Sequence, residues 1–180
     1  AISQSGETYD ILSILPRIKQ EGATVAAVVN VPGSSVARAA DHVIMQGAGP
    51  EICVVSTKAA LSQMVILLRI VLELALLEGT MTPSESKKNE LALSQLPGAI
   101  EQIVNERSGL IHRLAHQHCG IEHWLYLGRG IYYPIARESA LKMKEVSYLH
   151  AEGMPGGFLK HGTLSLISPE FCSVIFVPSP

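Results

Sequence analysis

The sequence predicts an α/β protein made of two units, each a three-layer helix–sheet–helix arrangement with a mainly parallel sheet. Short runs of β-branched and aromatic residues alternate with amphipathic segments in both halves of the chain. This alternation is typical of parallel strands joined by crossover helices. Each half also places a strand, a glycine turn and a helix start in succession, in "ISQSGET" and "LYLGRGI", which hints at a duplicated unit.

The first half opens on a polar turn and a helix over 9–22, which Gly22 is expected to end and Pro16 to kink or break. A β-branched strand over 23–31 then runs into the turn "PGSS". The remaining elements of this half are a short helix, a strand and a long apolar helix, over 35–41, 42–46 and 56–78.

The second half begins with a polar connection over 79–90. The elements expected after it are two amphipathic helices separated at Pro97-Gly98, a strand running into a glycine turn, a helix and a last strand, over 91–120, 123–130, 132–153 and 171–177. This pattern predicts a first domain over 1–80, connecting helices over 81–122 and a second domain over 123–180.

Charge and composition exclude several classes of protein. The 180 residues carry a formal net charge of -2, so no basic field is available for nucleic acid. The three cysteines have no CxxC spacing, which argues against a zinc site or a disulfide framework and suits the cytoplasm. The most apolar run, 64–77, is too short to cross a bilayer and is interrupted by Arg69 and Glu73, so we expect a soluble protein with no membrane contact.

The opening loop "SQSGET" places three hydroxyl side chains around Gly6, where a helix begins. Glycine allows close backbone approach, and a helix start offers free N–H groups and the positive end of the helix dipole. Together these make a phosphate site that needs no cationic side chain. An ordinary capped turn is the alternative, with Ser5 or Thr8 as N-cap. Ser56 and Thr57, at the start of the long helix, are favoured as caps over a second edge of the same site.

The helix over 136–152 carries the strongest catalytic pattern. Glu138, Lys142 and Glu145 are spaced i, i+4 and i+7, which places them on one face. A solvated charge stripe is the ordinary interpretation. A carboxylate beside a lysine in a partly buried site can instead act as a proton-transfer base. Lys160 and His161, in the glycine-rich loop that follows, are candidate acid or base groups, whereas "GRG" at 128–130 is negligible as a dinucleotide motif.

Five stretches in order carry a family resemblance: "SQSGET", "NVPGSS", "GPEICVVSTKAALSQ", "YLGRGIYYPIARESALKMKEVSYLHAEG" and "LKHGTLSLI". Together they resemble the isomerase half of the glutamine–fructose-6-phosphate aminotransferases, which consists of two sugar isomerase (SIS) domains. The resemblance covers nearly the whole chain and is weakest over 79–122. It implies two flavodoxin-like SIS units, an enzyme without metal or organic cofactor, and an obligate homodimer.

The resemblance also implies substrate-binding residues. Those matching the loop that holds the sugar phosphate are Ser3, Gln4, Ser5 and Thr8. Val54 and Ser56 match positions that line the sugar. The implied reaction converts fructose 6-phosphate and glutamine-derived ammonia to glucosamine 6-phosphate, with the ammonia supplied by a glutaminase domain of the parent chain.

The resemblance assigns catalytic roles to the charged helix. Glu145 matches the base that moves a proton between C1 and C2, and Lys142 and Glu138 match its companions. His161 matches a residue linked to sugar ring opening, which reaches the site from a second subunit. Phe158 departs from the family, which commonly has Glu there, so any role of that acid is absent.

Several family segments have no counterpart here: the glutaminase domain, the strand that should precede Ile2, the first sugar-binding loop and the C-terminal tail with its lysine. We therefore expect a fragment of a longer chain whose own activity is doubtful. Two alternatives stay open. One is a stand-alone SIS phosphosugar isomerase or deaminase, and the other a non-catalytic sugar-phosphate sensor, against which the retention of Glu145, Lys142 and His161 counts.

Overall fold

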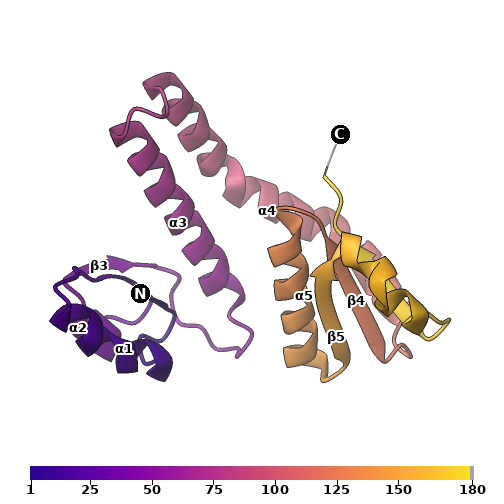
Figure 1. Cartoon of the computed structure of the whole chain (residues 1–180). Coiled ribbons are helices and arrows are strands. Elements are labelled where there is room, and N and C mark those ends of the chain that lie inside the picture. Colours follow the sequence, from indigo (N-terminus) through magenta and orange to yellow (C-terminus); the bar gives the residue numbers. More distant parts are fainter. Residues whose placement is uncertain (179–180) are drawn as a thin grey trace. The chain divides into compact units, whose positions relative to one another are not determined.

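Two parallel sheets organise the chain, one in each half. The computed structural model describes residues 1–178 (Figure 1). It divides into two units, Ala1–Ala99 and Ile100–Pro180. The first unit has a sheet of order β1-β2-β3 and the second a sheet of order β5-β4-β6, and every strand pair is parallel. The prediction of an α/β protein with parallel sheets is confirmed.

The first unit follows the predicted order of elements. They are β1 (Ile2–Ser3), α1 (Tyr9–Gln20), β2 (Ala26–Val29), α2 (Ser35–Ala39), β3 (His42–Met45) and α3 (Thr57–Leu77). The central strand β2 supplies Ala27 and Val29, both fully buried. They form a core with Leu15 of α1 and Val36 of α2, so both helices cover this face of the sheet. Because parallel strands end at one edge, the turns after β1, β2 and β3 meet there.

Helix α1 continues through Pro16 without a break. A proline in a helix interior removes one backbone hydrogen bond, which costs about 3 kcal/mol. Packing offsets that cost here, because Leu15 is buried and Ile11, Leu12 and Ile18 pack against the same core.

Helix α4 (Pro83–Gln117) corrects two predictions. The polar segment over 79–90 is helical from Pro83 onward, and the helix passes through Pro97 and Gly98 instead of dividing there. Its start is a capping box. Glu85 Oε2 accepts from the Thr82 N–H at 2.8 Å, and the Glu85 N–H donates to Thr82 Oγ1 at 3.3 Å. The motif "TPSE" was a readable helix start, with Pro83 at the first helical position.

The second unit contains β4 (His123–Gly128), α5 (Tyr132–Ser147), β5 (His150–Pro155), the 3₁₀ turns η1 (Gly156–His161) and η2 (Thr163–Leu166), and β6 (Phe171–Ile175). The buried residues Ala136 and Ala140 of α5 and Leu125 of β4 form part of its core. Small side chains on α5 allow the helix to approach the sheet closely. At Gly153 of β5 any Cβ would collide with the backbone of α5 at Arg137.

The helix predicted over 132–153 is wrong beyond Ser147. Tyr148 adopts a left-handed conformation with φ of 60°, which ends α5, and a strand follows from His150. The sequence of β5, "HAEGMP", contains no β-branched residue and gives no strand signal. Pairing with β4 along its whole length makes it a strand, from His123 opposite His150 to Gly128 opposite Pro155.

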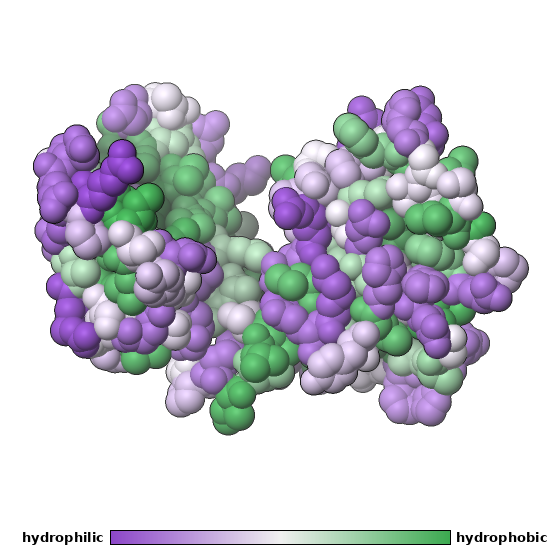
Figure 2. Space-filling model, turned by 60° about the horizontal axis from the view of Figure 1, so that its bottom comes forward, coloured by the Kyte–Doolittle hydropathy of each residue, from purple (hydrophilic) through white to green (hydrophobic). Residues whose placement is uncertain are grey.

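Helix α3 is the most apolar element. It has 21 residues and a mean hydropathy of 2.1 over its most apolar window, so by length and composition alone it could cross a membrane. The sequence prediction considered only the shorter run 64–77, which the helix extends toward its N-terminus. None of that window is buried, and Figure 2 shows apolar residues reaching the molecular surface. A core helix of a soluble protein meets the same criterion, and Arg69 and Glu73 interrupt this one.

Candidate functional site

In the first unit, the loop over 3–8 is held by its own hydroxyl groups. Ser3 is buried, and its Oγ lies 2.7 Å from Thr8 Oγ1 and accepts from the Gly6 N–H at 2.9 Å. Ser5 Oγ accepts from the Glu7 N–H at 3.1 Å. Because Thr8 is engaged with Ser3, it makes no side-chain capping bond to α1 although it occupies the N-cap position. In the first turn of α1, the N–H groups of Ile11 and Leu12 donate to Thr8 O, and the Thr8 side chain caps none of the others.

Gly6 is needed for two reasons. Its φ of 67° lies in the left-handed region, and a Cβ at this position would collide with the side chain of Ser34. Ser34 is buried, and its Oγ has no hydrogen-bond partner among the described residues. The "PGSS" turn after β2 thus packs directly on the loop, and the Val36 N–H donates to Gly6 O at 2.9 Å.

Glu7 fastens the loop to the same turn. Its Oε1 accepts from the Ser35 N–H at 2.8 Å. The hydrogen bonds from Ser35 lower the pKa of Glu7 below its ordinary value, and the nearby Arg38 lowers it further. From the sequence, Glu7 is expected only to favour the first turn of the helix, so this bond to the turn after β2 was not predicted.

A cavity of about 670 Å³ opens at the carboxyl ends of β1, β2 and β3. Its lining residues are Gln4, Asn30, Val31, Pro32, Met45, Gly47, Gly49, Pro50 and Glu51. Asn30 joins two of the loops, since its Nδ2 donates to Gly49 O at 2.7 Å and its Oδ1 accepts from the Ala48 N–H at 3.0 Å. Ligands bind parallel α/β sheets at this edge.

Only Gln4 of the six predicted binding residues lines this cavity. Val54 is 83% exposed, and Ser56, half-buried, has a left-handed backbone with φ of 52°. Ser56 occupies the N-cap position of α3 but makes no side-chain capping bond, so the prediction that it caps the helix is wrong. Glu51 does so instead, because its Oε2 accepts from the Ala59 N–H at 3.0 Å. The sequence reasoning missed Glu51, whose position eight residues before Ala59 lies outside the usual capping spacing.

In the second unit, the predicted charged face of α5 forms a connected cluster. Lys142 Nζ lies 3.1 Å from Glu138 Oε1 and 2.9 Å from Glu145 Oε2. All three side chains are partly buried, with 24% of Lys142, 38% of Glu138 and 31% of Glu145 exposed. Burial alone would lower the pKa of Lys142, but its hydrogen bonds to Glu145 and Glu138 outweigh this and raise it. Lys142 is therefore held as a cation between two carboxylates.

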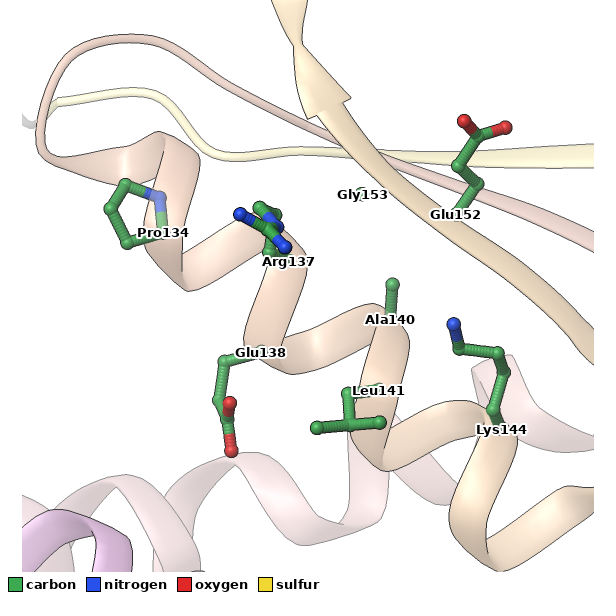
Figure 3. A pocket seen from close by; sticks show the side chains of 8 residues that line it. All are labelled: Pro134, Arg137, Glu138, Ala140, Leu141, Lys144, Glu152 and Gly153. Atoms are coloured by element: carbon green, nitrogen blue, oxygen red, sulfur yellow. The ribbon is translucent and has the colours of Figure 1, made fainter. Parts of the chain in front are cut away.

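A cavity of about 490 Å³ lies between α5 and β5, and Glu138 is the one member of the cluster that lines it. Figure 3 shows Arg137 and Lys144 leaving α5, with Glu152 of β5 across from them, while Glu138 points away from Glu152. The Arg137 guanidinium also lies over the ring of Tyr133, 5.9 Å from its centroid.

His161 ends η1, where its ring meets the ring of Phe158 edge-on at 6.1 Å. Within residues 1–178, no hydrogen bond or ion pair joins His161 to the cluster on α5. The described residues also hold no group of three or more His, Cys, Asp or Glu side chains that could bind a metal ion. The charged residues of α5 thus meet on one face, as their spacing predicts, and this cluster and the loop over 3–8 belong to different units.

Comparison with known proteins extends this description. The glutamine–fructose-6-phosphate aminotransferase of Caldanaerobacter subterraneus subsp. tengcongensis is 43% identical over 166 residues, which cover 92% of this chain and 27% of that protein. The enzyme of the same name from Streptomyces coelicolor is 42% identical over 183 residues, covering 100% of this chain and 29% of its own length. The chain therefore spans less than a third of these relatives.

Solved structures show the same similarity. The C-terminal domain of glucosamine-fructose-6-phosphate aminotransferase from Francisella tularensis superposes with a TM-score of 0.93 at 40% identity, covering 99% of this chain and 50% of that one. Glucosamine-6-phosphate deaminase from Thermotoga maritima shares the fold, with a TM-score of 0.74 at 16% identity over 97% of this chain and 50% of its own. Among protein families, the SIS domain matches residues 1–72 and 121–180. The chain belongs to the SIS-domain family.

Proposed function

We propose that this chain is the sugar-phosphate isomerase part of an aminotransferase that makes glucosamine 6-phosphate from fructose 6-phosphate and glutamine-derived ammonia. The observation that carries the proposal is the ion-paired cluster on α5, in which Lys142 holds Glu145 at 2.9 Å. The names of relatives about 42% identical over nearly the whole chain support the choice of reaction.

The loop over 3–8 binds the phosphate in this proposal. Ser3, Ser5 and Thr8 supply hydroxyl groups, and the first turn of α1 supplies N–H groups and a dipole that favours an anion. Gln4 faces the neighbouring cavity of about 670 Å³, where the carbon chain of the sugar would lie. Val54 and Ser56 complete the sugar site if the exposed segment before α3 closes over the bound ligand.

Glu145 is the proton-transfer base. After ammonia has condensed at C2 with release of water, the Glu145 carboxylate removes a proton from C1 of the open-chain sugar. The electron pair of the C1–H bond forms a C1–C2 double bond, while the C2–N π pair moves to nitrogen, which takes up a proton. The same group, now a carboxylic acid, returns its proton to C2, and C1 becomes an aldehyde as its hydroxyl group loses a proton. Lys142 supports this role by favouring the charged form of Glu145, and Glu138 tethers Lys142 from the other side at 3.1 Å.

His161 is assigned to opening of the sugar ring. In this proposal it acts at the site of a partner subunit in a homodimer, as the family resemblance implies. A glutaminase domain of the parent protein supplies the ammonia. The protein is soluble and cytoplasmic, in keeping with its three free cysteines.

Substitution of the base tests the proposal. In the full-length parent enzyme, Glu145→Gln should lower kcat about 10²–10⁴-fold with little change in the affinity for fructose 6-phosphate, because general base catalysis contributes about that much. Glu101→Gln, on an exposed part of α4, is the matched control and should keep full activity. Equal activities of the two variants would remove Glu145 from the mechanism.

A further inference from the structure

A pair of histidines lies at the amino ends of β4 and β5, at the opposite end of these strands from the turn η1 that follows β5. His123 begins β4 and His150 begins β5, and the two residues are direct partners in the parallel register. Their Nδ1 atoms lie 3.4 Å apart, with the ring centroids 5.3 Å apart. Both side chains are exposed, so the pair is open to solvent. Nothing in the proposed isomerase chemistry uses them.

The separation of the two nitrogens matches the bite of a metal chelate. Imidazole nitrogens bind Zn²⁺ at about 2.0–2.1 Å, so two of them on one tetrahedral ion lie about 3.3–3.4 Å apart. The rings are inclined at 72°, and a rotation about the soft final side-chain torsion directs both lone pairs to one point. We propose that His123 and His150 form a two-histidine site for a divalent transition-metal ion such as Zn²⁺ or Ni²⁺.

The surroundings hold one ligand in place. Phe171 of β6 is the register partner of His123 on its other side, and the two rings stack with centroids 5.6 Å apart and an inclination of 20°. Because stacking already restricts the His123 ring, this side chain loses less conformational entropy on binding an ion than an unrestrained histidine would. The main chain is fixed as well, because the His150 N–H donates to Glu122 O at 3.2 Å.

The alternation of side chains along the strands defines which groups share this face. Gly153 faces α5, so His150, three positions earlier, lies on the other face of β5. Cys172 follows Phe171 on β6 and therefore projects from the opposite face, and burial raises the pKa of its thiol. Thiolate coordination thus does not compete at this position.

The site has only two protein ligands, and this limits its expected affinity for the ion. Since no third His, Cys, Asp or Glu joins the pair within residues 1–178, water completes the coordination sphere. The chelate effect of two preplaced ligands is equivalent to a high effective concentration of the second one, worth about 100-fold in affinity. An ion there joins the first residues of β4 and β5 and stabilises the folded unit, because a ligand that binds only the native state raises its stability.

Nickel titration tests the site, with the fluorescence of Trp124 as a local signal. Trp124 is the only tryptophan and is adjacent to His123 in the sequence. A second histidine pair on α4, His112 and His116, has ring centroids 4.8 Å apart and could bind the same ion. The experiment therefore starts from a variant in which His112 and His116 are both alanine, as the reference protein.

The reference protein should bind one Ni²⁺ per chain, with quenching of Trp124 and a higher Tm in the presence of the ion. Adding His123→Ala or His150→Ala should weaken binding about 100-fold and abolish the rise in Tm. His42→Ala, which removes an exposed histidine of the first unit, should change neither quantity. His123→Gln keeps a polar side chain of similar reach in case the alanine variant folds poorly.

Two results would overturn the proposal. One is a reference protein that shows no binding at about 1 mM Ni²⁺, which would mean a Kd above about 1 mM. The other is unchanged affinity after substitution of either histidine in a protein whose circular dichroism is that of the reference. Neither result depends on enzymatic activity, so each is separate from the fate of the isomerase proposal.

Discussion

The loop over 3–8 and the charged face of α5 are both polar, but different forces hold them. The loop is joined by hydroxyl and backbone hydrogen bonds, such as the 2.7 Å contact of Ser3 and Thr8. The α5 cluster is joined by ion pairs, with Lys142 between two carboxylates. A site that holds an anion through N–H groups and hydroxyls depends on backbone shape. A site that moves protons depends instead on which charges are adjacent.

Backbone substitution should separate the two regions most strongly. Gly6→Ala should destabilise the protein by about 2–5 kcal/mol, since it adds left-handed strain and a collision with Ser34. Gly33→Ala is the matched control, because Gly33 has a φ of 68° but open space where a Cβ would lie. It should cost only about 1–2 kcal/mol. Urea denaturation measures both, and equal losses would show that the contact with Ser34 has no importance.

Removing the buried hydroxyl of the loop should have the next largest effect. Ser3→Ala deletes the acceptor of the Gly6 N–H and the partner of Thr8, and an unsatisfied buried donor costs about 1–3 kcal/mol. Calorimetric titration should also show weaker binding of fructose 6-phosphate. Ser13→Ala, on the exposed side of α1, serves as the control. Undiminished sugar-phosphate binding in Ser3→Ala would contradict the assignment of the phosphate to this loop.

A substitution in the α5 cluster should change kcat more than it changes the stability of the fold. Lys142→Met should lower kcat about 10–100-fold by leaving Glu138 and Glu145 without their cation, while stability changes by about 1 kcal/mol. The pH dependence has a definite sign. Because the pKa of Lys142 is raised on folding, its contribution is complete below the unfolded pKa and is lost as pH rises through the folded value. A pH series of urea denaturations should therefore show an alkaline loss of stability that is smaller in the variant.

The smallest effect should be at Glu7, and on the acid side. Its pKa is lowered on folding, so its contribution is present above the unfolded pKa and disappears as pH falls through the folded value. Glu7→Gln should reduce the acid dependence of Tm near that range, with Tm at pH 7 only slightly lower because the carboxylate is exposed. Glu21→Gln, an exposed carboxylate at the end of α1, should leave the acid dependence intact.

The strand and helix pattern of the first half could be predicted because its elements carry local signals, such as the β-branched run of β2 and the long apolar run of α3. Strand β5 could not, since its residues become a strand only through pairing with β4. Pro97 and Gly98 predict a break between two helices, but the capping box at Thr82 begins one helix, α4, that continues through both residues.

The candidate site shows the same division. The i, i+4, i+7 spacing of Glu138, Lys142 and Glu145 is a property of one helix, so the sequence predicts their contact. Glu51 caps α3 from eight residues before Ala59, outside the usual capping spacing, and Ser34 contacts Gly6 from a different turn, so only the folded chain brings each pair together. Residues with local partners could be identified, and those whose partners come from another element could not.

The order of strands in the second sheet has a consequence during protein synthesis. The central strand β4 pairs on one side with β5 and on the other with β6, where His123 is opposite Phe171. These partners are 171 − 123 = 48 residues apart. At about 5–20 residues per second, a ribosome needs about 2–10 s to make that interval. Throughout that time at least one edge of β4 is unpaired, so this strand is open to pairing with other chains until β6 has been made.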